Sequence, residues 1–325
     1  MKMKTVSTKL SWLDILNAWK VRWGIGRMNY RIKSGLYAVG DPDKDSPVLV
    51  SANYKLTFDI LRKNLKGIDC WLLILDTEGI NVWCAAGKGT FGTMNLINEI
   101  YRTHLSEFIN HKVLIVPQLG AVGIDANKIF EATGFNVLYG PIRAKDIKQY
   151  LQSGCTATIE MRTVHFDMYD RLILTPMELI PALEKSFFVI GLLTFLNLFI
   201  RKPFTKKDYH GLFTSIFTGS VITPILLPYI PGRAFSIKGA ITGFLGTALS
   251  QKPKNPALAL GHFLIFPAIS SYLALNFTGS STYTSPSGVE KEMRKALPFI
   301  IGGIVIGSLL TLGVHLLGKE KKNET

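Results

Sequence analysis

The hydrophobic pattern of this chain changes near residue 180, and this change limits its possible folds more than any other feature. Before that point, short apolar runs alternate with polar segments, as they do in soluble domains. After Leu183 the apolar runs lengthen and the charged residues gather in short clusters. We therefore predict an N-terminal arm over 1–45, an α/β domain over 46–178 and a transmembrane helical domain over 179–325.

Strand and helix patterns alternate through the predicted α/β domain. Strands are expected over 47–51, 70–75, 113–116 and 136–139, and helices over 56–65, 94–109, 126–133 and 144–151. Segment 70–75 (CWLLIL) is continuously apolar, which is typical of a buried parallel strand. The alternation predicts a Rossmann-like parallel sheet with helices on both faces. Such sheets bind ligands outside the carboxyl ends of their strands, so the four strand-end loops should face one site.

The C-terminal part contains five candidate spans, over 187–200, 212–230, 237–249, 257–275 and 297–317. A helix needs about 20 apolar residues to cross a bilayer, and the second, fourth and fifth segments reach that length alone. The net charge of +14 comes without a recognisable nucleic-acid motif, so we expect no nucleic-acid partner. We expect contact with membrane lipid instead, because cations beside apolar spans touch anionic headgroups.

The N-terminal arm contains a short amphipathic helix, predicted over 11–23 (SWLDILNAWKVRW). Its apolar residues fall at helical spacing on one face, and Ser11 with Asp14 resembles an N-terminal cap. Either the helix packs on its own domain or it anchors the chain at a membrane interface, where Trp is favoured. No apolar signal-peptide core follows the basic N-terminus, so the α/β domain is expected in the cytoplasm, where thiols remain reduced.

One of the three cysteines, Cys84, follows an apolar strand in the segment GINVWCAAGKG. A lone thiol in such a place is a candidate ligand or nucleophile. The P-loop pattern fails here. A literal match to the dinucleotide-binding pattern G-x-G-x-x-G occurs over 87–92, but it follows the second strand, whereas that pattern normally follows the first strand of its domain. Zinc partners at short spacing are missing, and a protease would need a His base from elsewhere in the chain. We expect Cys70 to be a core residue and Cys155 to be structural.

The eight residues around this thiol resemble the signature of the mercury-methylation corrinoid proteins at every position. They are Asn81, Val82, Trp83, Cys84, Ala85, Ala86, Gly87 and Lys88. The related corrinoid iron–sulfur proteins of acetyl-CoA synthesis share the domain but lack this cysteine. An α/β domain followed by a multi-span membrane domain also fits the resemblance.

The resemblance implies a cobalamin-type corrinoid, bound base-off with Cys84 as the lower axial ligand of cobalt. Asn81 and Trp83 would shape a cap helix over the corrin face, and Lys88 would stabilise the thiolate or a corrin side chain. The strand-end loops would hold the ring edge and nucleotide tail, through Asn53, Thr77, Gln118, Gly120, Tyr139 and Gly140.

The implied activity is that of a corrinoid-dependent methyltransferase that passes a methyl group from cobalt to Hg(II), giving methylmercury. A separate methylated-pterin methyltransferase would supply the methyl group. A ferredoxin-like iron–sulfur protein would act as reductant, since this sequence has no iron–sulfur motif. The chain would be a multi-pass protein of the cytoplasmic membrane, with its corrinoid domain in the cytoplasm. The alternatives are a membrane-tethered corrinoid methyl carrier of one-carbon metabolism and a transporter with a cytoplasmic regulatory domain.

Overall fold

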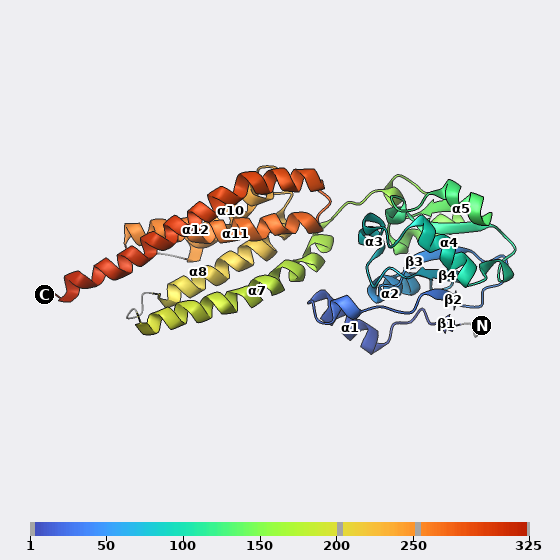
Figure 1. Cartoon of the computed structure of the whole chain (residues 1–325), viewed down its shortest axis with the longest axis horizontal. Coiled ribbons are helices and arrows are strands. Elements are labelled where there is room, and N and C mark those ends of the chain that lie inside the picture. The colour runs from blue at the N-terminus through green and yellow to red at the C-terminus, as the bar shows by residue number, and fades with distance from the viewer. Residues whose placement is uncertain (1–3, 200–203, 251–254, 324–325) are drawn as a thin grey trace. The chain divides into compact units, whose positions relative to one another are not determined.

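The computed structural model describes residues 4–199, 204–250 and 255–323. The chain forms two compact units (Figure 1). The first contains the residues up to Val21 together with Ile25–His165, and the second contains Arg22–Gly24 and the residues from Phe166 onward. The units therefore divide between His165 and Phe166, whereas the sequence places the start of the transmembrane part at 179.

The N-terminal unit is built on a six-stranded sheet in the order β1-β2-β4-β3-β5-β6. Its strands are β1 (Lys4–Val6), β2 (Gly35–Val39), β3 (Val48–Ala52), β4 (Cys70–Leu75), β5 (Val113–Pro117) and β6 (Asn136–Gly140). β3 pairs in parallel with β4 and β5, and β5 with β6, which confirms the parallel sheet for these four strands. The prediction of a purely parallel sheet is wrong for β2, which pairs antiparallel to β4. β2 occupies an edge of β4 whose backbone groups would otherwise be unpaired.

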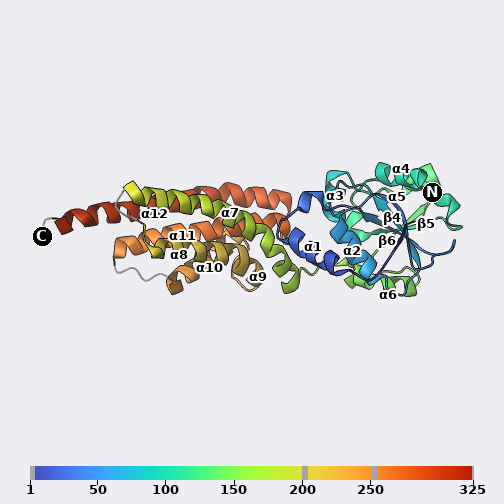
Figure 2. The same cartoon turned by 90° about the horizontal axis from the view of Figure 1, so that it is seen from below.

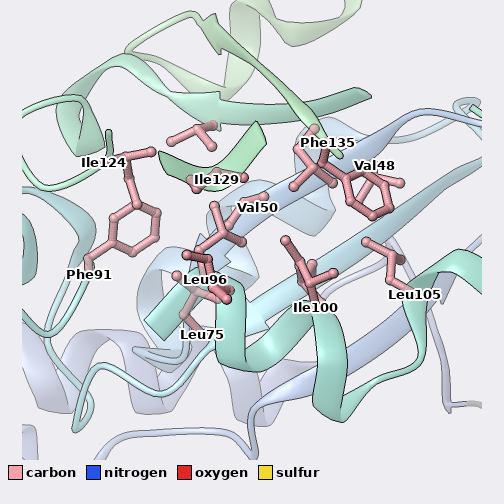
Figure 3. Close-up of a cluster of buried hydrophobic side chains, with 14 of the residues drawn as sticks. Val48, Val50, Leu75, Phe91, Leu96, Ile100, Leu105, Ile124, Ile129 and Phe135 are labelled. Atoms are coloured by element: carbon pink, nitrogen blue, oxygen red, sulfur yellow. The ribbon is translucent and has the colours of Figure 1, made fainter. Parts of the chain in front are cut away.

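Helices cover both faces of this sheet (Figure 2). They are α2 (Lys55–Asn64), α3 (Val82–Lys88), α4 (Thr93–Arg102), α5 (Ala126–Thr133) and α6 (Ile147–Gln152). The first core, drawn in part in Figure 3, packs Val50 and Leu73 against α3, α4 and α5. The second packs Leu49 and Leu72 against α2 and α6. Neighbouring residues of one strand serve opposite cores because strand side chains alternate between faces.

The order of the parallel strands creates a switch point between β3 and β5. The chain leaves β3 for β4 on one side and then returns across β3 to β5 on the other. The loops that follow β3 and β5 therefore diverge at the carboxyl edge of the sheet. Open α/β sheets bind ligands at such points.

Helix α1 (Trp12–Arg22) is held on α2 by ion pairs. The carboxylate of Asp14 lies 2.6 Å from Lys55 Nζ and 2.8 Å from Arg62 Nη2, and Asp59 contacts the same two cations at 2.6 and 2.8 Å. Burial would raise the pKa of Asp14, but hydrogen bonds from Lys55, Ser11 and Arg62 outweigh it and hold that pKa below its usual range. The polar side of α1 thus faces its own domain.

The second unit is helical. Its helices are α7 (Met168–Phe199), α8 (Lys206–Phe217), α9 (Thr223–Leu226), α10 (Phe235–Ser250), α11 (Pro256–Asn276) and α12 (Pro286–Asn323). Three described segments have the length and composition of a membrane span: Met168–Phe199, Pro256–Ser280 and Ser287–Val314. Of the other two predicted spans, one is interrupted by a π-helix at Thr218–Ile222 and the other, α10, has 16 residues. Ile200, the last residue of the first predicted span, lies outside the described residues.

Phe91 connects the loop before α4 to the first core. Its ring is fully buried and points toward Ile124 (Figure 3). We expect Phe91→Ala to lower the free energy of unfolding of this unit by about 3–5 kcal/mol, because it removes a large core side chain. Four of the five tryptophans, all except Trp23, belong to this unit, so Trp fluorescence in a denaturant titration mainly follows its unfolding. Phe91→Leu, the control, should cost less, and equal midpoints for Phe91→Ala and wild type would contradict this role.

Candidate functional site

Cys84 lies in the first turn of α3, after the carboxyl end of β4. Asn81 is the N-cap of this helix, and its side-chain oxygen accepts a hydrogen bond from the Cys84 backbone N–H at 3.0 Å. Gly89, with φ of +83°, ends the helix in the left-handed region. The Cys84 thiol is exposed. The family resemblance implies a cap helix here, and the structure places the cysteine in a short helix capped by Asn81.

The signature residues divide between two sides of α3. Val82, Ala85 and Ala86 are buried against the first core, whereas Trp83, Cys84, Gly87 and Lys88 are exposed. Cys84, Gly87 and Lys88 share one outer face, since residues three and four apart are neighbours on a helix. The thiol, an open glycine surface and a cation are therefore adjacent.

Gly87 has no packing reason to be glycine among the described residues. A Cβ built at this position meets no atom within 4 Å, and its φ is not positive. Glycine costs a helix roughly 0.5–1 kcal/mol relative to alanine. A flat group that lies over this face would explain the missing side chain.

Within the described part of the chain, no metal-ligand cluster forms around Cys84, and two candidate bases, His104 and His111, lie away from it. No group of three or more His, Cys, Asp or Glu there could hold a metal ion. His111 lies at the amino edge of the sheet, with Nε2 2.9 Å from the carbonyl oxygen of Ser46. His104 follows the far end of α4 and contacts Glu107. Cys84 can thus offer one soft ligand, and a metal bound there must bring its other ligands with it.

A cavity of about 300 Å³ lies beside α3 at the switch point of the sheet. Its walls come from β3, β5, α2, the start of α3 and the segment that follows β6. They include Leu49, Ile60, Trp83, Ile115, Ile142 and Ile147, with Ser51, Thr57 and Asn81 among the few polar residues. None of the described lining residues is ionisable. The cavity therefore suits a neutral, largely apolar group.

Two of the predicted loop residues act inside the protein. The side-chain oxygen of Asn53 accepts hydrogen bonds from Thr77 N, Thr77 Oγ1 and Gly79 N at 3.0–3.1 Å. Both Asn53 and Thr77 are buried. They tie the loop after β3 to the loop that leads into α3, so they position the signature segment.

The other predicted loop residues lie at the same edge in different environments. Gln118 accepts a hydrogen bond from Arg162 at 2.8 Å, and Gly120 packs against the ring of Phe91. Tyr139 donates to the Ile124 carbonyl oxygen at 2.8 Å, and burial raises its pKa.

Gly140 is the one predicted loop residue that lines the cavity; a Cβ there would come within 2.9 Å of Ile115 Cγ2. The four strand-end loops thus meet at one edge, and direct ligand contact by their residues stays a prediction.

The cavity includes residues that carry no sequence signal of a site. Thr57 and Ile60 belong to α2, and Ile142 and Ile147 follow β6, more than 80 positions away. Their separate patterns are those of ordinary helices and turns. Only the crossover between β3 and β5 brings them together.

The remaining cysteines are not part of this site. Cys70 is fully buried, and burial raises the pKa of its thiol to about 12, which confirms it as a core residue. Cys155 is half-buried in a turn with φ of +62°, and burial raises its pKa against a hydrogen bond with Tyr150. Cys84 is the exposed thiol among the three.

Comparison with known proteins places this region near proteins of acetyl-CoA metabolism. Residues 24–151 match the family described as CO dehydrogenase/acetyl-CoA synthase delta subunit. The chain is 33% identical over 131 residues to the acetyl-CoA decarbonylase/synthase complex subunit gamma of Methanopyrus kandleri, covering 40% of this chain and 28% of that protein. It is 35% identical over 128 residues to the corresponding subunit of Archaeoglobus fulgidus, covering 39% of this chain and 27% of that protein.

These matches concern part of each protein. The chain spans little more than a quarter of the length of these two curated relatives. The family match begins after α1 and ends within α6, so it includes α3 and the cavity but none of the helices from α7 onward. The expected relationship to proteins of acetyl-CoA synthesis is confirmed for this region.

Gly87 provides a direct test of the open helix face. We expect Gly87→Ala to raise the free energy of unfolding of the ligand-free α/β unit by roughly 0.5–1 kcal/mol, because alanine is the better helix former and meets no clash. The same variant should bind a corrinoid less tightly than wild type. Denaturant titration and spectroscopic titration with cobalamin measure the two effects. Lower stability together with unchanged binding would show that Gly87 is required by folding.

Proposed function

We propose that this chain is a membrane-bound corrinoid methyl carrier that gives methyl groups to Hg(II). The observation that carries the proposal is the exposed Cys84 thiol on a helix face left open by Gly87, next to an apolar cavity at the switch point. The eight-residue signature of the mercury-methylation corrinoid proteins supports the choice of acceptor. A bound corrinoid would supply the cobalt that receives and releases the methyl group.

The residues of the site fit such a cofactor. A corrin ring brings its own equatorial nitrogen ligands, so a site with one soft protein ligand is sufficient. Asn81 fixes the Cys84 backbone, and the side chains of Asn53 and Thr77 fix the loop before it. The cavity lined by Ile60 and Ile147 offers neutral apolar walls to the displaced nucleotide base.

The same proposal includes partners and location. A ferredoxin-like iron–sulfur protein would reduce the cofactor, and a methylated-pterin methyltransferase would supply the methyl group. Three segments with the length and composition of membrane spans support insertion into the cytoplasmic membrane. The α/β unit would then face the cytoplasm, where Cys84 remains a thiol.

A second candidate is a membrane-tethered corrinoid methyl carrier with an acceptor from one-carbon metabolism. The similarity of the α/β region to acetyl-CoA decarbonylase/synthase gamma subunits favours this reading. Both candidates use the same cofactor and the same Cys84, and they differ in the acceptor.

Cobalt spectroscopy tests the ligand assignment. The full chain is purified anaerobically in detergent, loaded with cobalamin and compared with Cys84→Ala and Cys155→Ala. We expect a thiolate-dependent absorption change in wild type and in Cys155→Ala, and its loss in Cys84→Ala, because Cys84 is the exposed thiol. Identical spectra for wild type and Cys84→Ala would show that Cys84 does not bind cobalt.

Methylmercury formation separates the two candidates. The chain is expressed with its ferredoxin-like partner in a host that does not methylate mercury, and the product is assayed after Hg(II) is added. We expect methylmercury from wild type and none from Cys84→Ala. Wild-type protein that holds corrinoid but forms no methylmercury would favour the one-carbon acceptor.

A further inference from the structure

The outer side of α1 is an exposed apolar surface. Trp12 is 73% exposed, Leu13 65% and Trp19 62%. We call this surface the tryptophan face; it consists of Trp12, Leu13, Ile15, Leu16 and Trp19 of α1 and of Trp23 directly after the helix, all exposed. Apolar residues gathered on one side of a surface helix normally face the core. Here they face away from the domain.

The ion pairs of α1 explain this inverted orientation. Asp14 lies on the opposite side of the helix and joins Lys55 and Arg62 of α2 at 2.6 and 2.8 Å. Arg62 also donates to the carbonyl oxygens of Ser7 and Lys9, at 2.6 and 3.1 Å. The helix is therefore fixed to the α/β unit by charge and hydrogen bonds. Its apolar side chains are left for another partner, as large exposed apolar patches usually indicate.

The composition of this surface fits a lipid headgroup region. Tryptophan prefers the interface between water and hydrocarbon, and leucine and isoleucine beside it can enter the acyl boundary. Lys9 and Lys20 are exposed cations before and within the helix, and cations favour anionic headgroups.

The chain also keeps the α/β unit near a bilayer. That unit ends at His165, and α7, the first segment with the composition of a span, begins at Met168. Three extended residues reach only about 10 Å.

We infer that the tryptophan face is a membrane-docking surface that holds the α/β unit on a bilayer containing anionic lipid. The attachment to the bilayer through α7 rests on the proposed insertion of that helix, whereas the outward orientation of the α1 apolar side chains does not. Docking gives the unit a second attachment to the membrane, independent of the link to α7.

Lipid quenching of tryptophan fluorescence tests this inference on the full chain. The helices from α7 onward contain no tryptophan, so quenching by lipid reports only Trp12, Trp19, Trp23, Trp71 and Trp83. The protein is reconstituted in vesicles of phosphatidylcholine and phosphatidylglycerol with bromine near the headgroup end of the acyl chains. We expect marked quenching in wild type.

Two variants that keep every tryptophan compare the tryptophan face with another exposed apolar site of the same unit. Leu13→Glu/Leu16→Glu should lower the quenched fraction at least ~twofold, because carboxylates disfavour entry into the interface. Ile159→Glu, at a still more exposed apolar site on the same unit, should leave it unchanged. Trp83→Phe should also retain the quenching.

Unquenched tryptophans in membrane-inserted wild type would overturn the inference. Another part of the protein or a second copy must then cover the tryptophan face. Quenching that survives in Leu13→Glu/Leu16→Glu would overturn it as well. Failure of the chain to resist alkaline extraction from the vesicles would contradict the proposed insertion instead, so the two failures are distinguishable.

Discussion

The parallel pairing of β3 with both β4 and β5 is the constraint on which the α/β unit depends. It places one strand at the centre and sends the following segments in opposite directions, so that the carboxyl edge opens between them. The cavity lies at this opening, and α3 with Cys84 lies on its rim. The backbone order of the sheet therefore decides where the cavity opens, and the side chains decide its chemical character.

The polar side chains nearest the signature segment mainly form hydrogen bonds with the protein's own backbone. Asn81 caps α3, and Asn53 collects three hydrogen bonds from the preceding loop. Buried polar groups that satisfy one another in this way make a loop rigid. The exposed side of α3 carries almost no such interactions. A rigid support below an open surface is the arrangement expected where a ligand, rather than the protein, completes the packing.

Much of the unit could be predicted from the sequence where a local pattern dominates. Strand β4 has the predicted bounds because six apolar residues stand between polar turns, and α5 because Asp125 caps it and Gly134 ends it. Strand β2 was missed because a five-residue strand has little periodicity. The helix at 82–88 was expected only from the family resemblance and not from periodicity, because seven residues with a glycine give a weak helical signal. The cysteine was identifiable from its sequence alone, whereas the cavity was not, because α2 and α6 meet only through the crossover.

Helix α2 has a double role that follows from its two faces. Lys55, Asp59 and Arg62 on one side hold α1, while Thr57, Ile60 and Leu61 form a wall of the cavity. The ten residues of α2 therefore both hold α1 and line the cavity. If one of these attachments shifts α2, the other must adapt, and thermodynamic reciprocity then requires the influence to run both ways. In the proposed function, a ligand bound in the cavity and the position of α1 would influence each other through α2, although no residue contacts both.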